Sequence, residues 1–457
     1  MVNRPNILYL HSHDTGRYIQ PYGRAVSSPN MQRLAEQGVL FRRSFCCNPT
    51  CSPSRAALLT GSYPHSNGMT GLAHRGWRLK DYNQHILHTL RRIGYYSALF
   101  GEQHIIDHSQ VHQIGYDLAM PGGTALERTQ AVASFLADSP PQPFFVSAGY
   151  EETHRRFHAA QPAIAGGAED ERYVRPPAIL PDTMQTRCDM ADLNASVRVL
   201  DGCYGQVLQA LDDAGLAENT LIICTTDHGI AFPGMKCTLT DHGIGVLLIM
   251  RGPEEFSGGK VVDALVSHLD LFPTICDLLG VDPPDWLQGI SMMPLLRGEV
   301  DNIRTEVYAE VNYHAAYEPQ RCVRTQRYKY IRRFDGRETA VLANCDDSLS
   351  KDLWLEAGWQ ERPQAQEYLF DLVFDPNEVC NLAADPDKQN VLEAMRAKLL
   401  QWMEEANDPL LSGSIPAPEG ALVNDPDALS ADEPTMPANQ MPSQLAGGTR
   451  SATPSPA

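Results

Sequence analysis

The stretch TLIICTTDHG, residues 220–229, joins a continuous apolar run to an aspartate and a histidine. An apolar run without polar alternation is typical of a strand that is covered on both faces, as in a parallel sheet. NILYLHSHD, residues 6–14, repeats this pattern near the start of the chain. Because the carboxyl ends of parallel strands share one edge of a sheet, we expect Asp14 and Asp227 to meet there.

Two further polar segments, GEQH at 101–104 and YEETH at 150–154, also follow expected strands. Helices are expected between the strands, at 29–41, 85–93 and 187–214. Strands that alternate with helices predict an α/β fold with a large mixed, mainly parallel sheet sandwiched by helices. Ligand-binding residues are expected beyond the carboxyl ends of its strands.

The character of the sequence changes near residue 300. Residues 1–300 carry the alternation of strands and helices, and we expect them to form the main domain. In 301–412, strand-like stretches with alternating charged residues precede an amphipathic helix, which predicts a smaller α+β subdomain. The tail 413–457 is rich in Pro, Ala and Ser without apolar periodicity, so we expect a disordered end or a segment that wraps a neighbouring subunit.

The composition limits the kind of partner. The net charge of −19 is opposite in sign to that of proteins that bind nucleic acid or anionic membranes, so neither partner is expected. The 11 cysteines show no metal-ligand spacing, which is typical of buried thiols in a reducing compartment. With only a short apolar run at its start, the chain is predicted to be cytoplasmic.

A third informative stretch is NPTCSPSRAALLTG, residues 48–61. Ser52 suits a helix N-cap, Pro53 suits the first helical position, and Gly61 can end the helix. Cys51 is then expected just outside the helix N-terminus, where backbone N–H groups and the helix dipole would hold an anion and lower the pKa of the thiol. A capped helix with a chance cysteine is the alternative interpretation.

Together these stretches resemble the sulfatase family of the alkaline-phosphatase-like superfamily. The resemblance is carried by Cys51-Ser-Pro-Ser-Arg55 with LLTGSYPHSNGM after it, by TTDHG at 225–229, by Lys236 with TLTDHG, and by EYLFDLVFDPNEVCNLA near the end. The pattern C-x-P-x-R is the family's signal for oxidation of the cysteine to formylglycine. HSNGMTGL and the general layout are most similar to the heparan N-sulfatase branch.

The resemblance implies a mechanism. Formylglycine made from Cys51 is a hydrated aldehyde; one hydroxyl attacks sulfur, and the second later expels sulfate. One divalent metal ion, calcium or manganese, would activate the attacking hydroxyl. The substrate would be a small sulfated anion, and maturation would require a formylglycine-generating enzyme as a partner.

The resemblance also implies a set of metal ligands, with Asp14, Asp227 and the side chain of Cys51 as its members. His228 stands where many sulfatases carry Asn and is similar to the phosphonate monoester hydrolase branch. His13 stands where sulfatases usually carry an aspartate, and it would either bind the metal or only orient Asp14. If both histidines bind, their imidazoles favour manganese or a related metal over calcium.

The catalytic residues implied by the resemblance are Arg55, His104, His154 and Lys236. Arg55 would hold the formylglycine hydrate and a metal-bound carboxylate, and Lys236 would reach the sulfate. His104 would contact the nucleophile, and His154 would protonate the leaving group. Glu102 is a departure, because it replaces a lysine that normally touches the sulfate.

Other basic residues flank these segments. His65 would either pair with the hydrate or act as a turn residue. Some of the remaining cations would line the substrate pocket of an acidic protein and draw an anion inward: Arg17, His74, Arg75, Arg78, Arg155 and Arg156.

Three functions stay open at this point. Sulfate ester hydrolysis is expected, with N-sulfonate cleavage as a variant suggested by the branch similarity. Glu102 and His228 favour a phosphonate monoester or phosphodiester hydrolase on the same machinery, because a monoanionic diester needs less positive charge. If Cys51 stays a thiol, the chain would be a catalytically silent binding protein. A homo-oligomer is compatible with each function.

Overall fold

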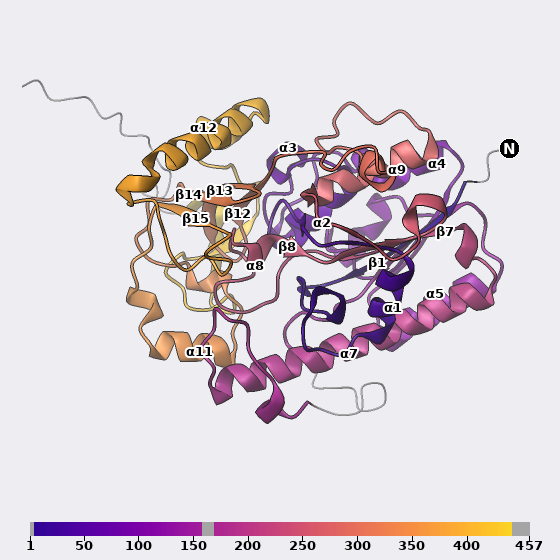
Figure 1. Cartoon of the computed structure of the whole chain (residues 1–457), viewed down its shortest axis with the longest axis horizontal. Coiled ribbons are helices and arrows are strands. Elements are labelled where there is room, and N and C mark those ends of the chain that lie inside the picture. The colour runs from indigo at the N-terminus through magenta and orange to yellow at the C-terminus, as the bar shows by residue number, and fades with distance from the viewer. Residues whose placement is uncertain (1–3, 158–168, 441–457) are drawn as a thin grey trace, which may run out of the picture.

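An eight-stranded sheet forms the centre of the computed structural model, which describes residues 4–157 and 169–440 (Figure 1). Its strands follow one another in the order β10 (Lys260–Val262), β2 (Val39–Phe41), β9 (Leu248–Arg251), β7 (Thr220–Thr226), β1 (Asn6–Ser12), β6 (Phe144–Gly149), β4 (Tyr96–Gly101) and β5 (Leu118–Pro121). Neighbouring strands of this sheet pair in parallel, except that β9 is antiparallel to both β7 and β2. The predicted mixed, mainly parallel sheet is confirmed.

Helices cover both faces of this sheet (Figure 1). The first layer contains α1 (Pro29–Gln37), α5 (Ala125–Ala137) and α7 (Met184–Asp213), and the second contains α2 (Cys51–Thr60), α4 (Ile86–Arg92) and α9 (Leu271–Leu279). Successive side chains of β1 pack on opposite faces of the sheet. Leu8 packs into the core beside α1 and α7, whereas Ile7 packs into the core beside α2 and α9. A strand buried on both faces in this way explains the continuous apolar run.

Short elements connect these layers. They are α3 (Pro64–Asn67), α8 (Asp241–Ile244), α10 (Met293–Leu296) and a small sheet of β11 (Val266–Ser267), β3 (Ser44–Phe45) and β8 (Gly245–Val246). The helix expected over 29–41 ends at Gln37, because Val39–Phe41 pairs with β9 and β10 instead. Pairing in the sheet overrides the helical spacing of that apolar run.

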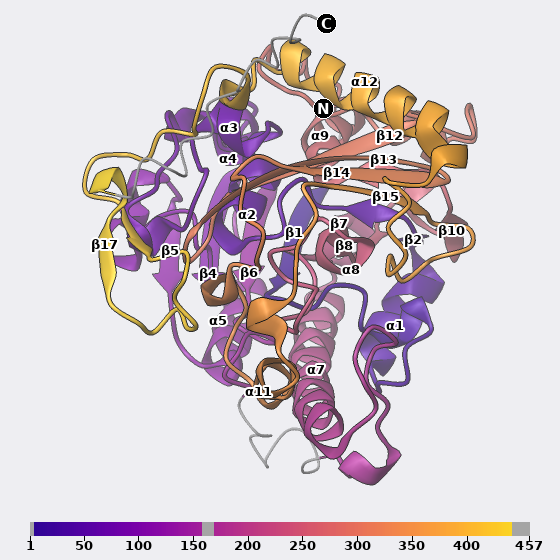
Figure 2. The same cartoon turned by 90° about the vertical axis from the view of Figure 1, so that its left-hand side faces the viewer.

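The C-terminal part forms a second, antiparallel sheet with a helix packed on it (Figure 2). The sheet contains β12 (Glu306–Tyr313), β13 (Tyr317–Thr325), β14 (Tyr328–Arg333) and β15 (Glu367–Asp371), accompanied by α11 (Leu349–Glu356) and α12 (Gln389–Glu405). Buried Leu392, Met395 and Leu399 of α12 pack in one core with Val323 and Tyr330 of the sheet. The predicted α+β subdomain is confirmed, and its boundary at residue 300 stays a prediction.

The tail is packed as far as residue 440, where its description ends. It contains β16 (Leu422–Asn424) and β17 (Thr435–Pro437), and Ile415 and Val423 are buried in the core of the main domain. Tyr313 Oη donates to the carbonyl oxygen of Ile415 at 2.7 Å, and Arg75 Nη1 donates to Asn424 Oδ1 at 2.7 Å. The expected disorder is therefore wrong for 413–440, because single apolar side chains of this segment pack into the core of the main domain. Residues 441–457 lie outside the described residues.

Among the described residues, no helix has both the length and the apolar character needed to cross a membrane.

Candidate active site

The site lies where β1 and β7 end side by side. Their parallel register sets Ser12 opposite Thr226, so the dipeptides that follow, His13-Asp14 and Asp227-His228, emerge together. The backbone N–H of Asp14 donates to Asp227 Oδ1 at 2.8 Å, which fixes the two turns to each other. Asp14 has a φ of 55°, a left-handed conformation that aspartate tolerates better than most residues.

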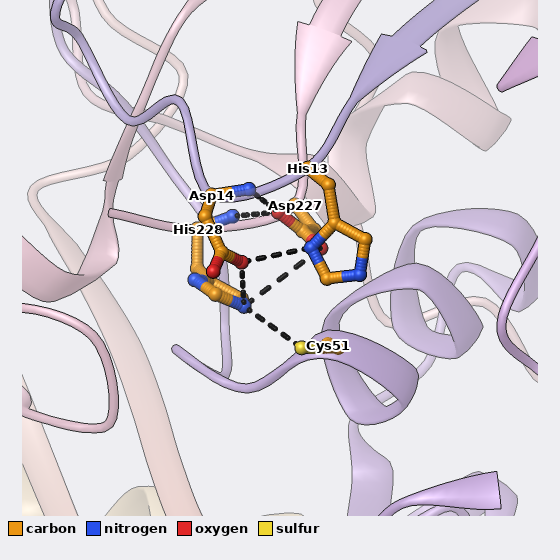
Figure 3. A group of neighbouring side chains, drawn as sticks. All are labelled: His13, Asp14, Cys51, Asp227 and His228. Atoms are coloured by element: carbon orange, nitrogen blue, oxygen red, sulfur yellow. Dashed lines mark hydrogen bonds and ion pairs between the residues drawn. The ribbon is translucent and has the colours of Figure 1, made fainter. Parts of the chain in front are cut away.

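Five potential ligand side chains converge at this point (Figure 3). They are His13, Asp14, Cys51, Asp227 and His228; one nitrogen, oxygen or sulfur atom from each lies within 4.8 Å of those of the others, and all five residues are buried. His13 Nδ1 lies 2.8 Å from Asp14 Oδ1 and 3.1 Å from Asp227 Oδ2. His228 Nε2 lies 3.4 Å from Cys51 Sγ and 3.3 Å from Asp14 Oδ1.

Cys51 is the first residue of α2, because the helix begins two positions earlier than predicted. Thr50 holds the N-cap position in an extended conformation, and the Ser52 hydroxyl accepts a hydrogen bond from the backbone N–H of Ala73 instead of capping the helix. Gly61 ends the helix in the left-handed region with a φ of 66°, as predicted. The thiol therefore sits at the helix N-terminus and faces the strand ends.

Burial governs the electrostatics of this site. It raises the pKa of the Cys51 thiol well above its usual value, so the lowered pKa expected from the helix terminus is wrong: loss of water outweighs the helix dipole and the nearby cations. Burial also lowers the pKa of His13, which keeps its imidazole neutral. Against the effect of burial, Lys236 holds the pKa of Asp14 well below its usual range, and His228 together with Arg55 lowers the pKa of Asp227.

These protonation states suit a divalent cation. A metal ligand must offer a lone pair, and the site offers ionised carboxylates of Asp14 and Asp227 with a neutral imidazole of His13. His13 Nδ1 and His228 Nε2 are both directed at Asp14 Oδ1, so donor atoms converge on one volume. Two carboxylates and two imidazoles suit manganese or a related metal better than calcium, which prefers oxygen ligands throughout.

Arg55 and Lys236 each form an ion pair with one of the two carboxylates. Arg55 Nη2 lies 3.0 Å from Asp227 Oδ2, and its remaining donors reach the Ser12 carbonyl at 2.9 Å and His11 Nδ1 at 2.6 Å. Lys236 Nζ lies 2.8 Å from Asp14 Oδ2. Both cations are buried, so neither is screened by bulk water.

His154 and His104 come from the turns after β6 and β4. His154 Nε2 lies 3.8 Å from Asp14 Oδ2 and 3.4 Å from Lys236 Nζ, at the partly exposed side of the site. The His104 ring centroid is 5.6 Å from that of His13, and His104 Nε2 pairs with His74 Nδ1 at 3.0 Å. Both predicted catalytic histidines therefore border the cluster, and their roles stay predictions.

Other candidates are directed elsewhere. Of the two alternatives for His65, pairing with the hydrate is wrong, because the ring pairs with Glu310 of β12 in a second buried cluster. Glu102 turns toward His108, whose Nε2 lies 3.5 Å from Glu102 Oε2.

Most of the basic residues suggested as pocket lining also have structural partners. Arg17 donates to the Ser44 carbonyl, and Arg75 bonds to the tail. Arg155 pairs with Asp189, while Arg156 is exposed near Asp432. Within the described residues, no recorded contact ties Arg78 to the cluster.

Sequence reasoning missed three polar residues at the site. His11 supports Arg55 from within β1, and Asp346 Oδ2 lies 3.2 Å from Lys236 Nζ. His314 is buried and close enough to Lys236 and Asp346 for their charges to act on its pKa, which burial lowers well below the usual value. Asp346 and His314 belong to the C-terminal subdomain and stand in stretches without a recognisable motif, whereas His11 stood within the quoted HSHD.

Sequence comparisons agree on one family. Residues 5–281 match the family model described as Sulfatase, and residues 235–348 match that described as N-sulphoglucosamine sulphohydrolase, C-terminal. The chain is 28% identical to human N-sulphoglucosamine sulphohydrolase, over 91% of this chain and 92% of that protein. It is 27% identical to an ulvan-active sulfatase of Formosa agariphila, over 92% of this chain and 77% of that protein.

Comparison with solved structures shows the same fold. A 2-O glycosaminoglycan sulfatase superimposes with a TM-score of 0.69 at 22% identity, covering 90% of this chain and 94% of that one. A protein solved in complex with its substrate, D-glucosamine-2-N,6-O-disulfate, superimposes with a TM-score of 0.71 at 19% identity, covering 93% and 99%. The chain therefore shares its fold, with polar residues gathered at the strand ends, with these solved proteins. It belongs to the sulfatase family, and it is a sulfuric ester hydrolase.

Proposed function

We propose that this sulfatase hydrolyses its substrate with a formylglycine made from Cys51 and one divalent metal ion held by His13, Asp14, Asp227 and His228. The observation that carries the proposal is the convergence of those four side chains on Cys51, which begins the C-x-P-x-R motif at a helix N-terminus. Cys51 Sγ lies 3.4 Å from His228 Nε2.

Formylglycine at position 51 would supply a hydrated aldehyde as the nucleophile, with a second hydroxyl through which the sulfate could be released. A divalent ion held by His13, Asp14, Asp227 and His228 would supply Lewis-acid activation and neutralise charge on the sulfate oxygens. An unmodified Cys51 would be a poor substitute, because burial raises the pKa of its thiol and keeps it protonated.

The chain's own residues position and neutralise the reacting groups. Arg55 holds Asp227 through Nε at 3.2 Å and Nη2 at 3.0 Å, which keeps that carboxylate turned toward position 51. Lys236 lies between Asp14 and Asp346 and presents a positive charge on the side where the sulfate oxygens would bind. Preorganised charges of this kind, shielded from water, lower the barrier without reorganising during the reaction.

His154 is suited to protonate the leaving group. Its ring is 28% exposed at the side chain, so it borders the route from solvent, and its Nε2 is directed at Lys236 and Asp14. An alkoxide or amide anion is a poor leaving group, and proton donation at this point would remove its charge.

A second candidate is cleavage of a sulfur–nitrogen bond in an N-sulfonated amino sugar. The match of residues 235–348 to the N-sulphoglucosamine sulphohydrolase C-terminal model and the likeness to the human enzyme of that name favour it. Hydrolysis of a phosphonate monoester or phosphodiester is the alternative that His228 and Glu102 left open.

The cysteines support a reducing compartment. All eleven are free, and eight of them are buried. We propose a cytoplasmic location on this basis, with a formylglycine-generating enzyme as the partner that matures Cys51.

The test combines the mass of the peptide that contains Cys51 with the initial rates of hydrolysis of four substrates. Protein isolated after co-expression with a formylglycine-generating enzyme is digested, and the peptide containing Cys51 should be lighter by about 18 Da than the unmodified peptide. Initial rates are then compared on an aryl sulfate, an N-sulfonated glucosamine, a phosphonate monoester and a phosphodiester. Faster turnover of both phosphorus substrates than of either sulfur substrate, or an unmodified Cys51 in active protein, would refute the proposal.

A further inference from the structure

Asp346 brings an additional carboxylate to the anion-binding side of the site. It follows the short helical turn Leu342–Asn344 and precedes α11, so it comes from the C-terminal subdomain. Its Oδ1 lies 3.3 Å and its Oδ2 3.2 Å from Lys236 Nζ. Oδ2 is buried and has no hydrogen bond of good geometry, so it retains an accepting lone pair. A buried oxygen in this state is a natural place for a ligand donor.

His314 adds a second incompletely satisfied group. It lies in the turn between β12 and β13, and only 7% of the residue is exposed. Its Nδ1 is buried without a hydrogen-bond partner in the described part of the chain. Lys236, Asp346 and His228 lie near enough for their charges to act on its ring.

The segment that carries Asp346 is firmly held. Lys351 Nζ donates to the Cys345 carbonyl at 2.7 Å, to the Leu429 carbonyl at 2.6 Å, and to Asp347 Oδ1 at 2.7 Å. Lys351 is almost fully buried, and the Leu429 contact ties the segment to the packed tail. Asp346 is therefore preorganised and does not have to be ordered by a ligand.

A negative group at this place needs an explanation. A carboxylate repels a sulfate, and Lys236 already has Asp14 as a counter-ion at 2.8 Å. Asp346 is ionised, because Lys236 lowers its pKa to about 2 against the effect of burial. A substrate that carries only a sulfo group would gain nothing from it, whereas a substrate with an N–H or O–H donor beside that group would satisfy the free oxygen.

We infer that Asp346 selects substrates in which a hydrogen-bond donor, an amine or hydroxyl, stands on the carbon next to the one that carries the sulfated oxygen or nitrogen. Sugars sulfated at a ring position beside a free hydroxyl or amine have this arrangement, and simple aryl sulfates lack it. The inference rests on the proposed function, because it places the sulfo group at Lys236. Asp346 accepts the donor's hydrogen, and Lys236 neutralises both acidic groups.

The test uses two chromogenic substrates that differ by one hydroxyl. 4-Nitrocatechol sulfate carries a hydroxyl next to the sulfate ester, and 4-nitrophenyl sulfate does not; both are assayed at acid pH, where that hydroxyl is protonated and can donate. A hydrogen bond to a charged acceptor is worth about 1.5–3 kcal/mol, so Asp346→Ala should lower kcat/KM for the catechol ester about 10- to 100-fold more than for the phenyl ester. Differences in leaving-group reactivity cancel, because each substrate is compared between wild type and variant.

Three variants accompany Asp346→Ala. Asp346→Glu keeps an acceptor and should retain part of the discrimination. His314→Ala should reduce it to a smaller extent. Asp352→Asn removes an exposed carboxylate on α11 and should leave both rates unchanged. Thermal unfolding of each variant checks that its fold is intact.

The outcomes separate this inference from the proposed function. An equal change in kcat/KM for both esters in Asp346→Ala and Asp346→Glu would overturn the selection by Asp346 while sulfate hydrolysis stands. Failure of wild-type, formylglycine-bearing protein to release sulfate from either ester or from an N-sulfonated glucosamine would overturn the proposed function, and this inference with it.

Discussion

Two buried clusters of carboxylates and histidines occur in the described part of this chain, and their contrast shows what makes one of them a candidate metal centre. The first is the strand-end cluster of His13, Asp14, Cys51, Asp227 and His228. The second, which we call the β12 cluster, contains His65, Glu310 and Asp408. Both are buried and both bring three or more potential ligands together.

The β12 cluster already contains its own cations. Arg321 pairs with Asp408 and lies 3.9 Å from Glu310, and it is fully buried. Burial alone would lower the pKa of His65, but Glu310 outweighs burial and raises it, which favours the charged form of the imidazole. The two carboxylates therefore face Arg321 and this imidazole, and the cluster serves as a buried ion-pair network between α3, β12 and the segment after α12.

The strand-end cluster differs in the protonation of one of its histidines, His13. Burial lowers the pKa of His13, which leaves a neutral ring with a lone pair for a metal. Both clusters contain residue types that bind metals, so residue type alone does not identify a metal site. What distinguishes them is the protonation state of the histidine, which burial and the neighbouring charges determine.

The largest expected effect comes from removing the sulfur at position 51. Cys51→Ala should reduce turnover by about 10⁵-fold or more, because the nucleophile would be absent and only binding would remain. The measurement is sulfate release at saturating substrate by ion chromatography. Cys380→Ala, which removes an exposed cysteine, is the control and should retain full activity. Substantial turnover by Cys51→Ala would show that another group attacks sulfur.

The comparison of the clusters is tested directly by a matched pair of variants. Asp227→Asn should lower the bound metal to background and abolish turnover, because an amide is a weaker ligand and leaves Arg55 without its carboxylate. Glu310→Gln should keep the metal content of wild type. It should cost about 3–5 kcal/mol of unfolding free energy, because Arg321 and His65 lose their partner.

Both variants are examined by elemental mass spectrometry after dialysis and by chemical denaturation. Loss of metal from Glu310→Gln with retention in Asp227→Asn would reverse the assignment of the two clusters.

A smaller and substrate-dependent effect is expected at His154. His154→Ala should reduce kcat/KM for an unactivated sugar sulfate by about 10²-fold or more, because the leaving group departs without a proton. Activated aryl sulfates should be affected far less, since their leaving groups are stable as anions. The check is a plot of log kcat/KM against leaving-group pKa, which should steepen in the variant. The same loss along the whole series would exclude proton donation by His154.

The features that could be predicted from the sequence are those encoded within a short stretch of residues. The apolar run before Asp227 identifies a buried strand, and parallel pairing then brings Asp14 beside it without further information. Cys51 was recognisable because its motif also encodes the helix start. The helix expected through 29–41 was wrong at its end, because pairing with two distant strands decided the conformation of Val39–Phe41.

What the sequence did not reveal depends on contacts between distant segments. Asp346 reaches Lys236 across 110 positions, from a loop with no periodicity or motif. His65 lay close to Cys51 in sequence, yet Glu310, 245 positions away, turns its ring into the other cluster. The lowered pKa expected for Cys51 failed for a related reason, because the helix dipole is a local feature and burial is not.

The smallest expected effect is a pH dependence of stability that belongs to the β12 cluster. The pKa of His65 is raised in the folded protein, since Glu310 favours its charged form despite burial. The folded state therefore binds the proton more tightly than the unfolded chain, whose histidine pKa is about 6.5. This stabilisation is fully present below pH 6.5 and is lost as the pH rises through the raised value. Its size is about 1.4 kcal/mol for each unit by which the pKa is raised.

His65→Gln removes this titration and should flatten the corresponding part of the profile. The measurement is the difference in unfolding free energy between wild type and His65→Gln from pH 5.5 to pH 9, in which contributions from the metal site cancel; the exposed His112→Gln is the control. The difference should be largest at the acid end and shrink toward the alkaline end. A difference that grows with pH would mean that His65 is neutral in the folded protein, and the β12 cluster would then offer the same kind of ligand as the strand-end cluster.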